Sequence, residues 1–140
     1  MAAKEPPYFK TDLHSRHLTL AAKMVPFAGW EMPLQYRGVF EEVAAVREAA
    51  GMFDVSHMGR LKIWGPTCRQ FLNSLVTIQF DGLRPGQARY GFALNETGGI
   101  IDDLVAYSLQ DSGDELGHLI IVCNAATRSK LLEVFENHAA

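Results

Sequence analysis

Two apolar runs separated by a glycine-containing turn constrain the fold of this 140-residue chain more than any other feature. Residues 88–94 and 100–109 alternate between apolar and polar positions, and the segment 95–99 between them ends in two glycines that can adopt a positive φ. This pattern predicts a β-hairpin. A continuous apolar run at 118–123, which follows a polar turn, predicts a further strand. The C-terminal half is therefore expected to contain a mixed or antiparallel sheet.

Helical spacing of apolar residues occurs on both sides of these strands. Four helices are predicted, at residues 11–22, 39–50, 65–76 and 125–138, and a strand broken near Gly59 is predicted at 52–63. The segment 24–38 holds two prolines, two glycines and several large apolar side chains. Because these residues interrupt helices and strands, we expect an extended loop there, which either covers a core or lines a ligand pocket.

The predicted element order leads to a fold class. Residues 60–138 have the order β–α–β–β–β–α, which resembles a split βαβ (ferredoxin-like) unit without its final strand. We therefore expect an α+β fold with helices flanking the sheet. We expect residues 1–51 to form helices and a loop that precede an α+β unit at 52–140. The apolar stripe of the last predicted helix suggests that the chain is the N-terminal part of a longer protein.

Composition excludes several classes of protein. Hydrophobic residues make up 48% and charged residues 21% of the chain, and the net charge of −3 comes without a basic stripe. These values are typical of a soluble globular domain and argue against nucleic acid as the main partner. No apolar run approaches the ~20 residues of a membrane span, and no targeting segment is visible. Cys68 and Cys123 lack metal-ligand spacing, so we expect free core thiols, no metal site and a cytoplasmic location.

An acidic pair interrupts the second strand of the predicted hairpin. Side chains alternate along a strand, so Asp102 and Asp103 point to opposite faces and one of them must enter apolar surroundings. Such a carboxylate suits a general acid or base, or a group that holds a cationic amine. It also suits a structural role, in which the carboxylate accepts backbone N–H groups near the end of the strand.

Two further groups of polar residues are weaker candidates. Asp54, Ser56 and His57 lie close together in the sequence, but a hydrolase triad draws on separated elements, and no nucleophile-elbow glycines flank Ser56. We therefore expect His57 to be a half-buried structural histidine. Tyr90 and Asn124 belong to strands or strand ends beside the acidic pair, so they could share a pocket with it.

Several sequence motifs resemble those of a known family and occur in the same order as in that family. The segments KMVPFAGWEMP at 23–33, VREAAGMFDVSHM at 46–58, LNE at 94–96 and GGIIDDL at 98–104 look like the T-protein family of the glycine cleavage system. The likeness runs over about residues 8–138. It implies a T-protein-like folate-binding domain and a tetrahydrofolate-dependent aminomethyltransferase. In that reaction the methylene of an aminomethyl group, carried on the lipoate of the H-protein, passes to tetrahydrofolate and ammonia is released.

The resemblance also assigns residues. By position it makes Asp103 the catalytic carboxylate, with Asp102 as the fallback, and it implies folate contacts at Met58, Tyr90, Val122 and Asn124. For this mechanism we expect Asp103 to be shielded from water and turned toward a pterin-sized hollow. The family also uses a Glu and an Arg from a later part of its chain, so we expect the 140 residues alone to bind folate poorly and to turn over little.

Two other functions remain open on the sequence. One is the folate module of a related demethylase or dehydrogenase, and the other is a non-catalytic folate-binding protein. Replacement of Asp103 by Asn separates catalysis from binding, because a transferase should lose rate by orders of magnitude and a binder should lose little.

Overall fold

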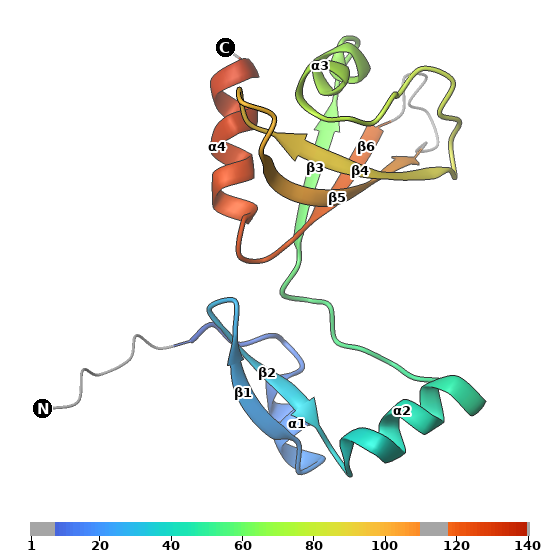
Figure 1. The fold of residues 1–140 in the computed structure, drawn as a ribbon, viewed down its shortest axis with the longest axis vertical. Helices are drawn as coiled ribbons and strands as arrows, with labels where there is room; N and C mark the ends of the chain where they lie inside the picture. Colours follow the sequence, from blue (N-terminus) through green and yellow to red (C-terminus); the bar gives the residue numbers. More distant parts are fainter. Residues whose placement is uncertain (1–7, 110–117, 140) are drawn as a thin grey trace, which may run out of the picture. The chain divides into compact units, whose positions relative to one another are not determined.

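The computed structural model describes residues 8–109 and 118–139, which form two compact units (Figure 1). Unit 1 is Met1–His57 and unit 2 is Met58–Ala140. Each unit is described by itself. None of the helices in these residue ranges is both long enough and apolar enough to span a bilayer.

Unit 1 contains a two-stranded hairpin between two helices. Its elements are α1 (His14–Thr19), β1 (Lys23–Phe27), β2 (Trp30–Gln35) and α2 (Val39–Glu48). The strands are antiparallel, and the two residues between them, Ala28 and Gly29, have φ of 50° and 82°. Two consecutive positive φ values are typical of a type I′ turn, whose twist matches that of paired strands.

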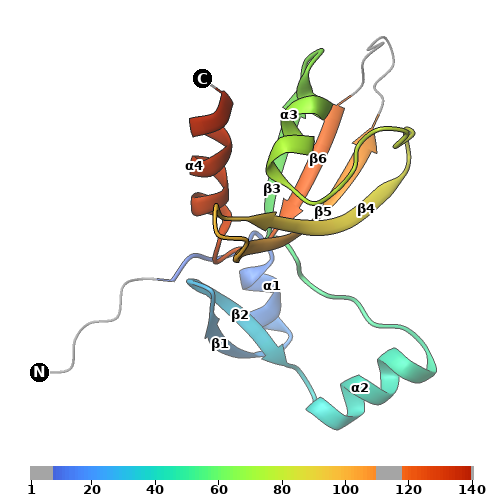
Figure 2. The same cartoon turned by 45° about the horizontal axis from the view of Figure 1, so that its top comes forward.

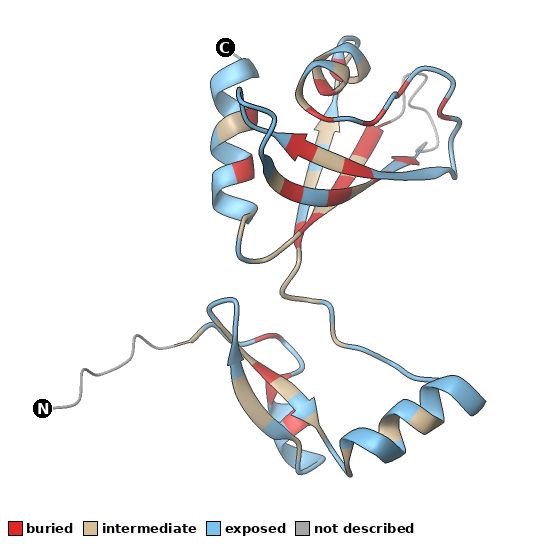
Figure 3. Ribbon diagram, viewed as in Figure 1, coloured by how far each residue is buried: buried red, intermediate tan, exposed pale blue. Residues whose placement is uncertain are grey.

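The hairpin corrects the expectation of an extended loop at 24–38. Pro26 and Pro33 stand opposite Glu31 and Met24 in the pairing. Both strands are edge strands, and the bridge from Phe9 to β2 is at Trp30 and not at Pro33. Proline is tolerated on edge strands, where its missing backbone N–H can face away from the ladder. The predicted helices at 11–22 and 39–50 do form, in shorter versions, as α1 and α2. None of the α2 residues is buried (Figure 3).

Unit 2 is a four-stranded antiparallel sheet with two helices. Its elements are β3 (Gly59–Trp64), α3 (Cys68–Leu75), β4 (Ala88–Leu94), β5 (Ile100–Leu109), β6 (His118–Cys123) and α4 (Arg128–Ala139). The strand order is β3-β6-β5-β4 (Figure 2). The predicted α+β class, the antiparallel sheet and the flanking helices are confirmed, and β4, β5 and β6 have the predicted bounds. The strand predicted at 52–63 begins only at Gly59.

One detail differs from the split βαβ arrangement. A βαβ unit joins two parallel strands through a helix. Here α3 joins β3 to β4, which lie at opposite edges of the sheet, and all three pairings among the described strands are antiparallel. In a split βαβ unit one strand separates the two parallel strands, whereas here both β5 and β6 lie between β3 and β4, so β3 and β4 run antiparallel.

The core lies on one face of this sheet. Leu104 and Ala106 of β5 and Ile121 of β6 are at most 1% exposed and pack with residues of α3, α4 and the segment 76–83. Gly91 of β4 belongs to the same face, and a Cβ there would lie 2.5 Å from Ile78 Cγ1. The absence of a side chain at position 91 therefore lets the segment after α3 approach the sheet.

The opposite face of the sheet, called here the open face, carries the alternate residues of each strand. No helix of the described part of unit 2 contributes to a core on this side. Cross-strand partners share a face, so the register gives rows that run across all four strands. One such row is Tyr90, Val105, Val122 and Arg60.

Candidate functional site

Asp103 lies on the open face and is held by two neutral donors. The Tyr90 hydroxyl donates to Asp103 Oδ2 at 3.1 Å, and Asn124 Nδ2 donates to Asp103 Oδ1 at 2.8 Å. Tyr90 comes from β4, Asp103 from β5, and Asn124 follows β6, so adjacent strands bring the three side chains together. Both carboxylate oxygens keep lone pairs for a ligand, because each accepts one of these bonds.

Asp102 is the buried member of the acidic pair. It is 4% exposed, and it accepts the Asn124 backbone N–H at 3.1 Å and the Asn124 side-chain amide at 2.8 Å. This is the structural role that the sequence left open, a carboxylate that accepts a backbone N–H beside a strand end. The expectation that Asp103 is shielded from water is wrong, because residue 103 is exposed. Packing of α3 and α4 selects the face of Asp102 as the core.

Val122 and Met58 also belong to the neighbourhood of Asp103. Val122 is partly buried and pairs with Val105, two residues from Asp103 on the same face. Met58 directly precedes Gly59, which pairs with Cys123, so the register places Met58 beside Asn124. The five residues named for a folate site thus come from adjacent strands of unit 2, at one end of the sheet.

The phenol of Tyr90 is a hydrogen-bond donor at neutral pH. Partial loss of hydration raises its pKa above the ordinary value, and the hydrogen bond to the Asp103 carboxylate and the charge of that group raise it further. The Asn124 amide must present its nitrogen to the acidic pair, because its oxygen would face two negative charges. These two donors orient Asp103 without neutralising it.

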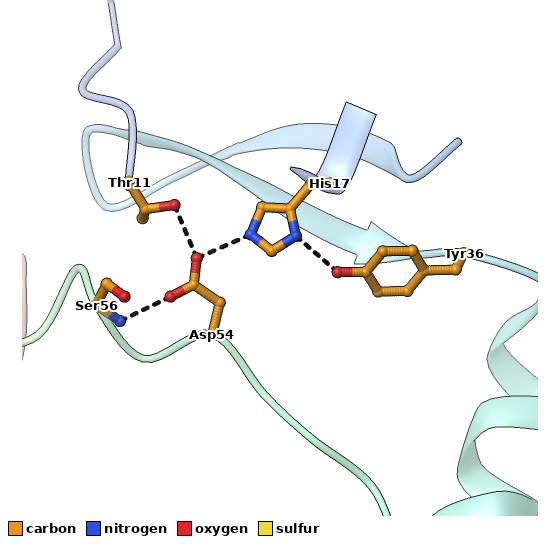
Figure 4. Close-up of polar contacts among 5 residues, drawn as sticks. All are labelled: Thr11, His17, Tyr36, Asp54 and Ser56. Atoms are coloured by element: carbon orange, nitrogen blue, oxygen red, sulfur yellow. Dashed lines mark hydrogen bonds and ion pairs between the residues drawn. The ribbon is translucent and has the colours of Figure 1, made fainter. Parts of the chain in front are cut away.

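A second polar cluster lies in unit 1 (Figure 4). His17 Nε2 lies 2.8 Å from Asp54 Oδ2, and the Tyr36 hydroxyl lies 2.8 Å from His17 Nδ1. The Thr11 hydroxyl and the Ser56 backbone N–H also donate to the Asp54 carboxylate, at 2.8 and 2.9 Å. With Asp54 as acceptor, a neutral His17 donates from Nε2, and its Nδ1 accepts a hydrogen bond from the Tyr36 hydroxyl.

The partner of Asp54 in this cluster is not the neighbouring His57, for which the sequence predicts a structural role. The histidine that meets Asp54 is His17, 37 positions away, while the ring of His57 lies edge-on to Phe27 at 5.7 Å between centroids. Burial acts to raise the pKa of the Asp54 carboxyl, but the hydrogen bonds from Ser56, His17 and Thr11 outweigh burial and hold the pKa far below its usual range. Asp54 is therefore a charged acceptor that fastens α1 to the segment after α2.

Two hollows of unit 2 lie away from Asp103. One, of about 740 Å³, lies between the end of α3, the β4–β5 turn and α4, and includes Thr77, Asn95 and Lys130. Another, of about 480 Å³, lies along β3 and α4, and includes Trp64 and Phe135. Neither includes Asp103. Among the residues that the structure describes, no group of His, Cys, Asp and Glu is placed to hold a metal ion.

Comparisons with known proteins agree on one family. The family described as GCVT N-terminal domain matches residues 13–140. Aminomethyltransferases of Thermotoga maritima and Desulforamulus reducens are 48% and 47% identical over 130 and 121 residues. These stretches are 93% and 86% of this chain, but 34% and 32% of the relatives. The chain thus spans about a third of the length of the curated relatives that it matches.

A solved structure agrees with the sequence comparisons. The crystal structure of glycine cleavage system aminomethyltransferase T from Bartonella henselae superposes with a TM-score of 0.88 at 34% identity. The superposition covers 95% of this chain and 36% of that one. Both the sequence and the fold are therefore similar to the same part of these enzymes.

Proposed function

This chain belongs to the GCVT N-terminal domain family, and on that premise we propose that its open face is the folate-binding surface of a tetrahydrofolate-dependent aminomethyltransferase. The donor in this proposal is aminomethyl-lipoate on the H-protein of the glycine cleavage system, and the reaction takes place in the cytoplasm. The methylene is transferred to tetrahydrofolate, ammonia is released, and dihydrolipoate remains on the carrier. Asp103 is the catalytic carboxylate, and Met58, Tyr90, Val122 and Asn124 contact the folate.

The observation that carries the proposal is the orientation of Asp103. Tyr90 and Asn124 each donate to one of its oxygens, at 3.1 and 2.8 Å, and fix the plane of the carboxylate. A folate nitrogen forms a bond to the methylene carbon while the C–S bond breaks and its electron pair stays on the lipoyl sulfur. Ammonia then leaves, and the fixed negative charge of Asp103 stabilises the iminium cation that forms on the folate nitrogen. The free lone pairs of Asp103 also accept a ring N–H of the folate, which places the attacking nitrogen. Apolar surface for the ring comes from Val122, Met58 and Phe92.

Exposure of Asp103 limits what these 140 residues do alone. Water competes for a carboxylate on an open face, and an electrostatic contribution to catalysis is weaker in water than in a closed site. We therefore expect weak folate binding and little turnover from the 140-residue chain. High activity of the chain by itself would contradict this account of the site.

A chimera tests the proposed activity. The aligned 130 residues of the Thermotoga maritima aminomethyltransferase are replaced by this chain, and tetrahydrofolate-dependent ammonia release from the aminomethyl-lipoyl carrier is measured. We expect the chimera to be active and D103N to lower its rate by about a hundredfold or more. The control is K130Q, a change of charge on an exposed residue of α4, with the rate retained. A folded chimera that binds folate without any transfer would contradict the proposal.

The same exposure favours one alternative, a folate-binding protein without catalysis. An exposed carboxylate is adequate for holding a ring N–H, because binding does not require the low dielectric that strengthens catalysis. The D103N chimera separates the two functions. A binder loses affinity only severalfold and has no transfer rate to lose, whereas a transferase loses rate at saturating folate.

A further inference from the structure

The two edges of the unit 2 sheet differ in what covers them. The chain itself covers the outer side of β4, because the Thr77 N–H donates to the Phe92 carbonyl at 2.8 Å and the Thr77 hydroxyl accepts the Phe92 N–H at 2.9 Å. Among the described strands, β3 pairs only with β6 (Figure 2). A strand at the end of an antiparallel sheet presents the N–H and C=O groups of alternate residues outward. The β3 edge can therefore accept a further strand.

An apolar groove runs beside this edge. The hollow of about 480 Å³ is lined by residues 60–64 of β3 and by side chains of α3 and α4. Leu61 and Ile63 lie on the core face, yet both are only partly buried. Their partners on β6, Ile121 and Leu119, are at most 1% exposed. The difference arises because no described strand lies outside β3, and an added strand would cover the part of these side chains that is still exposed.

Two cations lie along the same strand on its other face. Arg60 and Lys62 alternate with Leu61 and Ile63, so they belong to the open face, and both are exposed. The side chains of an added strand would alternate in the same way, because cross-strand partners share a face. Its residues opposite Leu61 and Ile63 would enter the groove, and its residues opposite Arg60 and Lys62 would meet positive charge.

These charges argue against a second copy of the chain as the added strand. Symmetric antiparallel pairing of two β3 edges, with both grooves on one side, has two registers of greatest overlap, centred on Leu61 and on Lys62. The first register places Arg60 opposite Lys62, and the second places Lys62 opposite Lys62. Like charges directly opposite each other destabilise a pair of strands, whereas a carboxylate opposite either cation stabilises it.

We propose that β3 binds an extended segment of a partner protein in which apolar and acidic residues alternate, and that this segment adds a strand to the sheet. Its backbone pairs with the outward N–H and C=O groups of β3, its apolar side chains enter the groove, and its Asp or Glu side chains meet Arg60 and Lys62. Glu136 of α4 also lines the groove and repels carboxylates there, which keeps the acidic residues on the open face. This site goes beyond the proposed function, because Asp103 does not line the groove.

Three synthetic peptides test the proposal on the 140-residue chain. The first is an end-capped peptide of seven residues in which valine and glutamate alternate. The second has lysine in place of glutamate, and the third has the composition of the first with its valines and glutamates in two blocks. NMR shifts of the isotopically labelled chain locate the binding of each peptide. Hydrogen exchange of the β3 amides is the second readout, because strand pairing protects outward N–H groups, whereas contact through side chains alone does not.

Charge reversal separates a local contact from an effect of net charge. R60E and K62E reverse the two charges on β3, and the control K130E makes the same change at an exposed residue of α4 that lines the other hollow. L132S removes apolar surface of the groove at an exposed position of α4. Circular dichroism verifies the fold of each variant, and sedimentation equilibrium measures the oligomeric state.

We expect the alternating valine–glutamate peptide to bind, with shifts concentrated on β3 and slower exchange of alternate β3 amides, and the other two peptides to bind about tenfold more weakly or not at all. R60E and K62E should each weaken binding of the first peptide by about threefold to tenfold and strengthen binding of the lysine peptide. L132S should weaken binding of the first peptide, and K130E should leave it unchanged.

Several results would overturn the proposal. Equal binding of the lysine peptide or of the block peptide would show that alternation of apolar and acidic residues is not recognised. An equal loss in K130E would assign the effect to net charge, and binding without protection of the β3 amides would exclude strand addition. A dimer of the unsubstituted chain with protected β3 amides would make a second copy the occupant. Failure of the first peptide to bind also overturns the proposal and leaves the proposed folate site untouched.

Discussion

Asn124 holds Asp102 by both oxygens of its carboxylate, one through the backbone N–H at 3.1 Å and the other through Nδ2 at 2.8 Å. The contact joins the end of β6 to the β4–β5 hairpin near its turn. Only 4% of Asp102 is exposed, and donors that face both of its oxygens offset the cost of burying this polar group. The same Nδ2 also donates to Asp103, so this one residue couples the buried carboxylate to the exposed one.

Asn124→Asp should therefore destabilise unit 2. The substitution removes the amide donor and adds a third carboxylate beside two others, and we expect a loss of about 1–3 kcal/mol in the free energy of unfolding. Urea denaturation at neutral pH measures it. Asn73→Asp is the matched control, because Asn73 uses its Oδ1 to accept the Phe80 N–H at 2.8 Å, and Asp retains that acceptor. Equal losses in the two variants would argue against this role for Asn124.

Substitutions at the two residues of the acidic pair should have different effects, on stability at Asp102 and on activity at Asp103. Asp102→Asn places an amide nitrogen among the donors of Asn124, and we expect it to cost about 1–3 kcal/mol of unfolding free energy. Asp103 is exposed, so Asp103→Asn should change the unfolding free energy by less than about 0.5 kcal/mol. Denaturation curves of both variants check the stability half of this expectation. The chimera described above checks the activity half, where Asp103→Asn is the variant that loses rate.

The Asp54 cluster should make the stability of unit 1 depend on acid. The folded-state pKa of Asp54 lies far below its ordinary value of 3.8. Its contribution to stability is therefore complete above the unfolded pKa and is lost as the pH falls below that value toward the folded-state pKa. Unfolding of unit 1, followed by NMR signals of β1 and β2 between pH 7 and pH 2, measures this loss.

Asp54→Asn provides the comparison. The variant should be less stable at neutral pH and should show a flatter dependence on pH in the acid range, because the titrating group is absent. Asp12, an exposed carboxylate of the same unit, gives the control Asp12→Asn. If the stability of unit 1 falls with decreasing pH as steeply in Asp54→Asn as in the unsubstituted chain, other carboxylates cause that loss.

Gly91→Ala should disturb the contact between β4 and the segment after α3. The added Cβ would lie 2.5 Å from Ile78 Cγ1 and 2.9 Å from Thr77 Oγ1, so the neighbours must move. We expect a cost of about 1–3 kcal/mol from overpacking. At Gly38 an added Cβ meets nothing within 4 Å and the φ of 167° is extended backbone, so Gly38→Ala is the control with little change. Thermal unfolding of both variants gives the comparison.

Local signals explain which elements could be predicted. The bounds of β4, β5 and β6 agree with prediction because glycines and polar turn residues mark the ends of alternating or continuous apolar runs. The β1–β2 hairpin was missed because Pro26 and Pro33 argue against strands, whereas a two-stranded sheet tolerates them at its free edges. Ala28 at a positive φ gives no signal in the sequence.

Long-range packing explains what the sequence left open at the site. Alternation placed Asp102 and Asp103 on opposite faces, but only the docking of α3 and α4 decides which face becomes the core. The pairing of Asp54 with His17 spans 37 positions, so no local motif contains both residues. The folate residues, by contrast, came from resemblance to a family, and their roles stay predictions until the variants are measured.

Because α2 buries none of its ten residues, its cohesion comes from its own backbone ladder and from the Glu42 carboxylate that accepts the N–H groups of Tyr36, Arg37 and Gly38. Isolated helices of this length are marginal in water. The amide protons of α2 should therefore exchange with deuterated solvent through frequent local opening, whereas those of β5 at Leu104 and Ala106 should wait for rarer and larger fluctuations of the sheet. The chain is therefore expected to have two classes of amide exchange rate, a fast one in α2 and a slow one in β5, which hydrogen–deuterium exchange measures residue by residue.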